Sequence, residues 1–108
     1  MNATATHELA NPFLYACEQL AQDFYKMHGL NPEQILKKER ELSTLKAELA
    51  KTREAFAEAE ATVTALSGQA KAQAYTRLFN FQGKRNELEE KVWELDYVLA
   101  MLKSPRFA

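Results

Sequence analysis

Few side chains in this sequence are of the types that carry out catalysis. Its 108 residues include one cysteine, Cys17, and two histidines, His7 and His28. A cysteine becomes a nucleophile when a histidine lies within hydrogen-bond reach of its sulfur atom. On one helix Cys17 and His28 would lie roughly 16 Å apart, because each residue advances the axis by about 1.5 Å. We therefore expect Cys17 to be a buried core residue and His28 to stabilise the C-terminal end of a helix.

Motifs that bind metals, cofactors or nucleotides are also missing from the sequence. There is no Cys-x-x-Cys, no Glu-x-x-His pair, no histidine cluster and no glycine-rich phosphate loop. Metal sites and nucleotide-binding loops depend on such spacings. The sequence therefore predicts a protein that is not an enzyme and has no cofactor or metal ion.

A basic stretch over residues 71–85 has the composition of a surface that binds nucleic acid. No Asp or Glu occurs between Ala61 and Asn86. In such surfaces cations contact phosphates and aromatic rings stack on bases. The opposing interpretation is that the cations belong to a solvated helix face and pair with nearby acids. The residues proposed to contact nucleic acid are Lys71, Arg77 and Lys84, with Tyr75, Phe79 and Phe81 between them.

Two segments that must position these side chains carry apolar residues in a three-four alternation. This spacing forms a narrow apolar seam on an α-helix and is typical of coiled-coil packing. The sequence therefore predicts an all-α fold: a long antiparallel coiled-coil helical hairpin. The seam residues are Ile35, Leu42, Leu45, Leu49, Phe56, Ala59, Val63 and Leu66 in the first segment, and Ala74, Leu78, Phe81, Leu88, Val92, Leu95, Leu99 and Leu102 in the second.

The polar interruptions of the two seams indicate how the segments align. A chain reversal at residues 67–69 that places Leu42 opposite Leu95 also places Thr52 opposite Arg85. We interpret Thr52 and Arg85 as a register layer, because a buried polar layer costs stability but fixes one alignment. The alternative is that Arg85 extends its guanidinium group past Thr52 into water.

Charged residues beside the seams support the same alignment. It places Lys46 near Glu89 and Glu48 near Lys91. Exposed pairs of this kind contribute only ~0.3–0.5 kcal/mol each. They therefore indicate the register more than they stabilise it.

Local signals set the expected helix boundaries. Asn11-Pro12 and Asn31-Pro32 each combine a side-chain acceptor with a residue that has no N–H to satisfy, which favours a helix start. Gly29 can end the first helix in a left-handed conformation. Because the seam keeps its phase across Gly83, we expect a continuous last helix. The predicted elements, in one domain over residues 1–108, are helices at about 12–28, 32–66 and 70–103 and a turn at 67–69.

Composition restricts the setting in which the protein works. Its 14 basic and 15 acidic side chains give a net charge of −1, which exerts no general attraction on nucleic acid or anionic membranes. No apolar run approaches the ~20 residues that span a bilayer. The N-terminal residues lack the basic and apolar segments of a secretory signal. A single cysteine suits a reducing compartment, so we expect a cytoplasmic protein that does not bind membranes.

The short helix at 12–28 is expected to pack on the open end of the hairpin. Its amphipathic face and its short connection to the next helix favour an antiparallel neighbour. The flank that it is expected to cover carries large aromatic residues on one helix and small residues on the other. These residues are Trp93, Tyr97 and Ala100 opposite Leu36, Ser43 and Ala50.

Beyond the reach of this helix, the same flank continues as Ala57 and Thr64 beside Tyr75 and Phe79. We call these four residues the aromatic strip. An apolar strip on a two-helix segment is a candidate for cover by a partner, most simply a second copy in a homodimer with a four-helix core. The alternative is that the strip stays in contact with water. The opposite flank, which carries Glu58 and Arg77, is expected to face solvent.

The function that these observations favour is a non-catalytic protein–protein interaction module. It would act as an adaptor, assembly factor, chaperone-like protein or inhibitor, and would bind another protein or a second copy of itself by helix packing. The alternative is a nucleic-acid-associated regulator that uses the basic aromatic stretch 71–85. The sequence does not name the partner.

Overall fold

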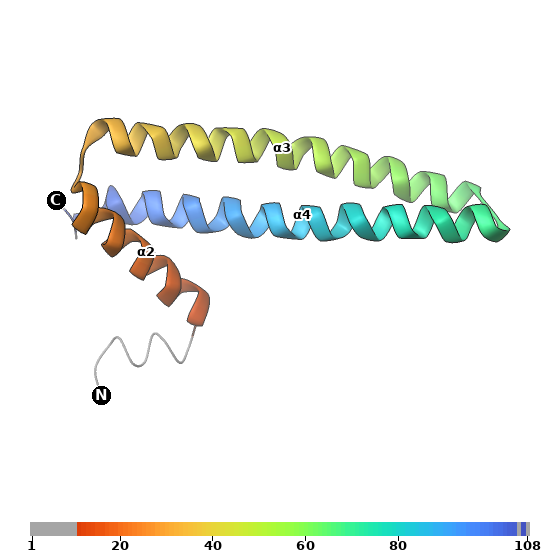
Figure 1. The fold of residues 1–108 in the computed structure, drawn as a ribbon, viewed down its shortest axis with the longest axis horizontal. Coiled ribbons are helices and arrows are strands. Elements are labelled where there is room, and N and C mark those ends of the chain that lie inside the picture. The colour runs from red at the N-terminus through yellow and green to blue at the C-terminus, as the bar shows by residue number, and fades with distance from the viewer. Residues whose placement is uncertain (1–10, 106, 108) are drawn as a thin grey trace. The chain divides into compact units, whose positions relative to one another are not determined.

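Three helices make up the part of the chain that the structure describes. The computed structural model describes residues 11–105 and 107, which contain helices α2 (Pro12–His28), α3 (Pro32–Ala65) and α4 (Gly68–Leu102) and no strand. Helices α3 and α4 form an antiparallel hairpin, and α2 is a shorter N-terminal helix (Figure 1). The predicted all-α hairpin with a shorter N-terminal helix is therefore confirmed. His7 lies outside the described residues.

The two Asn-Pro pairs act as helix starts in the structure. The side-chain oxygen of Asn11 accepts a hydrogen bond from the backbone N–H of Leu14 at 3.2 Å. The side-chain oxygen of Asn31 accepts from the N–H groups of Glu33, at 2.9 Å, and Gln34, at 3.4 Å. Each asparagine thus satisfies amides of the first turn that have no partner within the helix.

Two glycines with positive φ end or begin the helices. Gly29, at φ 61°, follows α2 and donates its N–H to the carbonyl oxygen of Tyr25 at 2.7 Å. Gly68, at φ 64°, is the first residue of α4. The turn predicted at residues 67–69 is in fact Leu66 and Ser67, because Gly68 adopts a left-handed conformation that lets α4 begin directly.

Helix α4 is continuous through Gly83, as the phase of the seam predicted. A Cβ atom added at this position would meet no heavy atom within 4 Å. Gly83 therefore has no packing reason to be glycine within the described structure, and it weakens the helix only through its backbone entropy.

The described residues divide into two compact units. The first unit contains the described residues of 1–42 and 93–108, and the second spans Ser43–Val92. Helices α3 and α4 each contribute a segment to both units.

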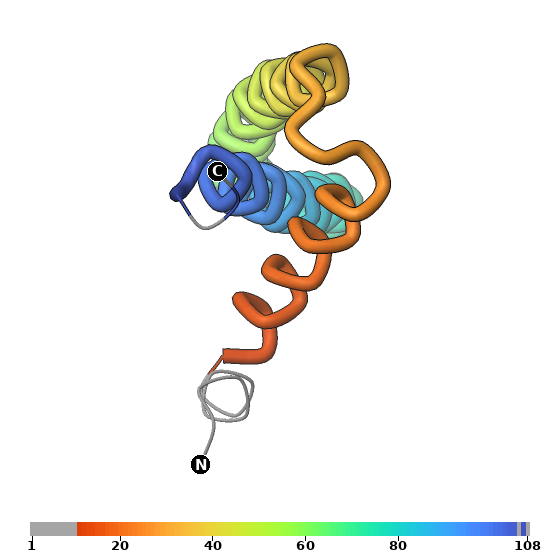
Figure 2. The backbone as a smooth tube through the Cα atoms, turned by 90° about the vertical axis from the view of Figure 1, so that its left-hand side faces the viewer, coloured from red at the N-terminus to blue at the C-terminus, as the bar shows by residue number. Residues whose placement is uncertain are grey.

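The core of the first unit lies between α2 and α4. Cys17 and Ala21 of α2 are buried against Val98 and Leu102 of α4. Figure 2 shows α2 beside α4 in this unit. Partly buried side chains surround these four residues: Phe13, Phe24, Tyr97, Met101 and Phe107.

The predicted docking flank is correct for Tyr97 of α4 and wrong for the start of α3, and Trp93 and Ala100 of α4 stay exposed. The ring of Phe13 lies 5.8 Å from that of Trp93, and Tyr97 packs against the core. Leu36, however, is 45% exposed. On α4 the core instead consists of Val98 and the seam residue Leu102, with Met101 partly buried against them.

In the second unit, the predicted seam forms the contact between α3 and α4. Leu49, Ala59, Val63 and Leu88 are buried, and so is the polar Thr52. The other predicted seam residues of this unit are half-buried: Leu45, Phe56, Leu66, Ala74, Leu78, Phe81 and Val92. The three-four alternation therefore identified the residues that hold the two helices together.

Candidate interaction surfaces

The register layer in the second unit is made of separate contacts. The hydroxyl group of Thr52, which is only 5% exposed, donates to the carbonyl oxygen of Glu48 at 2.9 Å. The guanidinium carbon of Arg85 lies 4.4 Å from the ring centroid of Phe56. Arg85 thus stacks on the ring of the opposite helix, and Thr52 is satisfied within its own helix.

Not all N–H donors of Arg85 have a hydrogen-bond partner among the described residues. One terminal nitrogen donates to the side-chain oxygen of Asn86 at 3.4 Å. The Nε atom is buried and has no hydrogen-bond partner among the described residues, although it lies 3.9 Å from a carboxylate oxygen of Glu89. The charged group therefore lies between the apolar seam and the polar flank, held by Phe56 on one side and Glu89 on the other.

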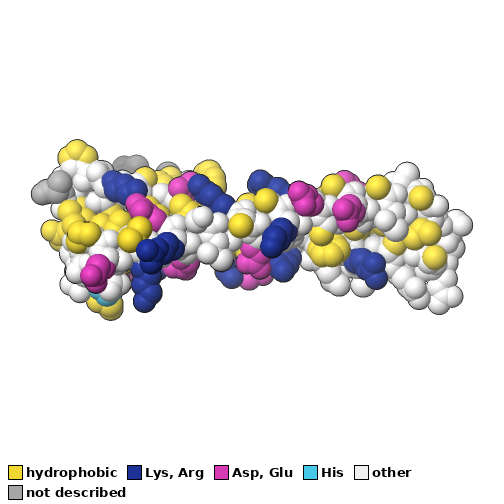
Figure 3. All heavy atoms as spheres, turned by 90° about the horizontal axis from the view of Figure 1, so that it is seen from above, with side chains coloured by type: hydrophobic (Ala, Val, Ile, Leu, Met, Phe, Trp, Pro, Cys, Tyr) yellow, Lys and Arg dark blue, Asp and Glu magenta, His cyan; other side chains and the backbone are white. Residues whose placement is uncertain are grey.

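Two ion pairs join α3 to α4 around this layer. Glu48 pairs with Lys84 at 3.6 Å, and Arg53 pairs with Glu89 at 3.2 Å. Acidic and basic side chains alternate among hydrophobic ones on the face drawn in Figure 3. Both pairs join opposite charges across the two helices.

The two ion pairs expected from the sequence are wrong. Glu89 pairs with Arg53 and Arg85, and Lys46 has no ion pair among the described residues. Lys91 pairs with Glu87 along α4, at 3.2 Å, and not with Glu48. Long side chains reach about one turn along the helix. The predicted register therefore indicates the region in which a charged residue finds its ion-pair partner, but not which residue that partner is.

The aromatic strip lies on the exposed surface of the second unit. The rings of Tyr75 and Phe79 stack with centroids 6.1 Å apart and an interplanar angle of 23°. They are 40% and 61% exposed. Ala57 and Thr64 are also exposed, and the Thr64 hydroxyl donates to the carbonyl oxygen of Glu60 at 3.0 Å. The structure thus brings the two aromatic residues together and leaves both accessible.

The proposed nucleic-acid contacts are not equivalent in the structure. Lys84 is paired with Glu48. Lys71 and Arg77 have no ion pair among residues 11–105 and 107. Phe81 is half-buried between the helices. The basic aromatic stretch therefore does not present all its cations and rings to solvent.

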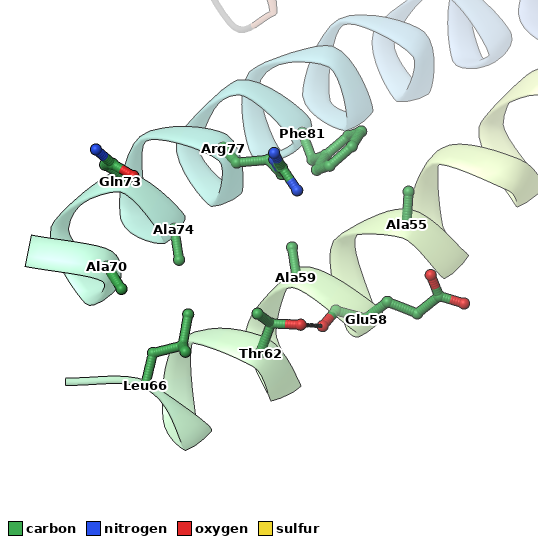
Figure 4. Close-up of a pocket in the computed structure, with 10 residues that line it drawn as sticks. All are labelled: Ala55, Glu58, Ala59, Thr62, Leu66, Ala70, Gln73, Ala74, Arg77 and Phe81. Carbon is green, nitrogen blue, oxygen red and sulfur yellow. Dashed lines mark hydrogen bonds between the residues drawn. The ribbon is translucent and has the colours of Figure 1, made fainter.

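A groove between α3 and α4 in the second unit was not found by sequence reasoning. Its volume is about 440 Å³. Its small side chains leave space between the helices, as Figure 4 shows. We call it the alanine groove, and it is lined by Ala55, Ala59, Ala70, Ala74, Leu66, Phe81, Glu58, Thr62, Gln73 and Arg77.

The polar residues of the alanine groove differ in orientation. Arg77 extends from α4 into the space between the helices, near Phe81 (Figure 4). The carboxylate of Glu58 points away from that space. The Thr62 hydroxyl is used within α3, where it donates to the carbonyl oxygen of Glu58 at 2.9 Å. Arg77 is therefore the charged group that faces the groove.

The first unit has a smaller hollow beside α2. It has a volume of about 380 Å³ and is lined by Leu14, Trp93, Asp96, Tyr97 and Ala100. Trp93 forms one wall and is 64% exposed even though it contacts Phe13. The hollow thus exposes one large aromatic side chain.

The described residues offer no arrangement for nucleophilic or metal chemistry. Burial, and to a smaller extent the charge of Glu94, raise the pKa of the Cys17 thiol above its ordinary value, which disfavours the reactive thiolate. His28 lies at the end of α2, with its ring 5.0 Å from that of Phe24. No group of three or more His, Cys, Asp or Glu residues in the described part of the chain is placed to hold a metal ion.

None of the described helices is long and apolar enough to cross a membrane. Neither a protein family, nor a curated protein, nor a solved structure matches this chain. The surfaces themselves are thus the basis for a functional proposal.

Proposed function

We propose that this chain is a non-catalytic interaction module that binds another protein, or a second copy of itself, by helix packing. The observation that supports this most strongly is the exposed, stacked pair Tyr75 and Phe79. Aromatic residues are enriched in protein interfaces because each buries a large area at low entropic cost. Complete burial of a side chain of this size contributes roughly 1.5–3 kcal/mol, and covering rings that are 40% and 61% exposed contributes part of that.

A second copy is the simplest partner for the aromatic strip. A two-fold axis would place the strip of one copy against the same strip of the other, so that one apolar surface covers itself. The α3 and α4 segments of both copies would then form a four-helix core, in which small residues such as Ala57 accommodate the rings. We therefore propose a homodimer, in the reducing cytoplasm that a single buried cysteine suits.

Replacing Tyr75 and Phe79 with serine tests this proposal. We expect the wild-type chain to scatter light with twice the 12.3 kDa mass of the monomer, and Tyr75→Ser/Phe79→Ser to scatter as a monomer. The matched control is Met27→Ser/Leu36→Ser, which removes two exposed apolar side chains from the first unit. The control should keep the dimer mass. A monomer mass for the wild type at every concentration would contradict self-association.

The alternative, a nucleic-acid-associated regulator, has weaker support. Of the basic residues in the stretch 71–85, Lys84 and Arg85 already contact carboxylates of Glu48 and Glu89. Lys71 and Arg77, which have no ion pair in the described part of the chain, make a small electrostatic contribution to phosphate binding. Nucleic acid is therefore the less favoured of the two partner classes.

A further inference from the structure

We propose that the alanine groove binds an acidic amphipathic helix and that Arg77 is its charge contact. The inference rests on the proposed function, because it names the chemistry of a partner for a helix-binding module. It uses a different surface, since neither Tyr75 nor Phe79 lines the groove. The two proposals can therefore fail separately.

The dimensions of the groove fit a short helix. One wall runs along residues 55–66, which are the end of α3 and the first residue of the turn, and the other along residues 70–81 of α4. Each wall corresponds to roughly 16 Å, or about three helical turns. A helix of this length presents apolar side chains at positions i, i+3 or i+4, and i+7 along one face. The bound helix would pack against α3 and α4 as the third member of a helical bundle.

The small side chains of the groove determine which residues the partner needs. Ala59 on α3 and Ala74 on α4 lie in the middle of the groove, whereas Ala55 lies near the larger Phe81 at one end and Ala70 near Leu66 at the other. Alanine walls leave room that only large apolar side chains fill to the density of a protein interior. The partner should therefore carry residues of the size of Leu or Phe on its apolar face.

The charge of the groove selects an acidic partner over a basic one. Arg77 faces the groove and has no ion pair among the described residues. The chain between Ala61 and Asn86 contains no acid, and the carboxylate of Glu58 points away from the groove. An Asp or Glu at the edge of the partner's apolar face would pair with Arg77, with bidentate geometry available to the guanidinium group.

The probe for this proposal is a synthetic amphipathic peptide of about four helical turns. It carries Leu at helix-spaced positions on one face and Glu elsewhere, and its counterpart has Lys in place of every Glu. Fluorescence anisotropy with the full chain at low salt should show saturable binding of the acidic peptide, about tenfold tighter than that of the basic peptide. Equal binding of both peptides, or no saturable binding of the acidic one, would overturn the proposal.

Charge reversal in the chain tests the role of Arg77. Arg77→Glu should weaken binding of the acidic peptide by about tenfold and strengthen that of the basic peptide. Lys71→Glu makes the same change in charge outside the groove lining and should leave the preference intact. An equal loss of affinity for the acidic peptide in both variants would show that binding depends only on the general charge of the stretch. The proposal would then be wrong.

A third variant tests the location without changing charge. Ala70→Trp places a bulky side chain at an exposed position of the groove wall and should weaken binding of the acidic peptide. The variant Tyr75→Ser/Phe79→Ser should bind this peptide as tightly as the wild type does. Circular dichroism verifies that each variant keeps its helix content. If single-stranded DNA competes for the groove, or if Ala70→Trp abolishes a wild-type dimer, the occupant is nucleic acid or a second copy, and the proposal of an acidic helix fails.

Discussion

Arg85 shows how a single residue can be both part of a seam and in contact with the polar flank. Its guanidinium group stacks on Phe56, and its buried Nε atom has no hydrogen-bond partner among the described residues. A cation over a ring contributes about 0.5–1 kcal/mol at an exposed site, whereas a buried, unpartnered N–H costs about 1–3 kcal/mol. On these magnitudes the layer costs stability overall.

Replacing the register layer with apolar residues should therefore stabilise the chain. Thr52→Leu/Arg85→Leu removes the buried polar groups and extends the seam, which we expect to raise the free energy of unfolding by about 1–2 kcal/mol. Thermal unfolding followed by circular dichroism should show a higher melting temperature. A lower melting temperature would show instead that the contacts of Arg85 with Phe56 and Glu89 outweigh the cost of its burial.

The cysteine gives a pH dependence with a definite sign. Burial, with Glu94 nearby, raises the pKa of the Cys17 thiol in the folded chain. As pH rises, the thiol therefore ionises in the unfolded chain before it does in the folded chain. The stability due to the neutral thiol is complete below its ordinary pKa of 9.0 and is lost as pH rises toward the folded-state pKa. Urea titrations at increasing pH should show this decline in the wild type.

Cys17→Ala is the control for this pH dependence, because it removes the thiol and keeps an apolar side chain at a fully buried position. The difference in unfolding free energy between wild type and variant should shrink as the solution becomes more alkaline. A constant difference across this pH range would show that Cys17 does not titrate with unfolding.

At the scale of the helix, the two glycines of α4 should respond oppositely to alanine. Gly83 lies in a helix interior with open space around its Cα atom, so Gly83→Ala should raise the unfolding free energy by about 0.5–1 kcal/mol. Gly68 has φ 64°, which a Cβ atom disfavours, so Gly68→Ala should lower it by about 1–2 kcal/mol. Both effects are measurable by chemical denaturation. A gain at Gly68 or a loss at Gly83 would contradict the observed backbone.

Local patterns predicted the helices well because their causes are local. Asn11 and Asn31 cap the helices that their sequence context indicated, and the seam residues are those that the three-four alternation selected. The turn was predicted to start one residue and to end two residues too late, since nothing in the sequence showed that Gly68 would belong to α4. Boundaries of this kind depend on one φ angle and not on a pattern.

The candidate surfaces were predicted less completely, because they depend on side-chain packing. The aromatic strip was named from helix geometry alone, and Tyr75 and Phe79 do stack. The alanine groove was missed because it results from small side chains. Alanine occupies both seam and surface positions in a helix, so its presence in the sequence does not indicate a groove. A signal was available in the four alanines at residues 55, 59, 70 and 74, which lie close to the turn on both helices.

At the scale of the whole molecule, two surfaces of the second unit carry the functional proposals. The aromatic strip offers apolar rings and no charge, whereas the alanine groove combines small apolar walls with Arg77, a cation that has no ion pair among the residues that the structure describes. Interfaces draw specificity from such differences, because a partner that suits one surface leaves charges unpaired or cavities unfilled on the other. We therefore propose that a second copy and a different helix would bind at separate surfaces of the chain.

A photocrosslinking residue at position 79 tests the central claim most directly. We expect irradiation in an extract of the cells that produce the protein to link this position to a second copy or to another protein. The same residue at position 27, where Met27 is 77% exposed in the first unit, should give far less adduct. An equal yield of adducts at positions 79 and 27 would contradict the account, because the aromatic strip would then be no more a binding surface than any other exposed apolar residue.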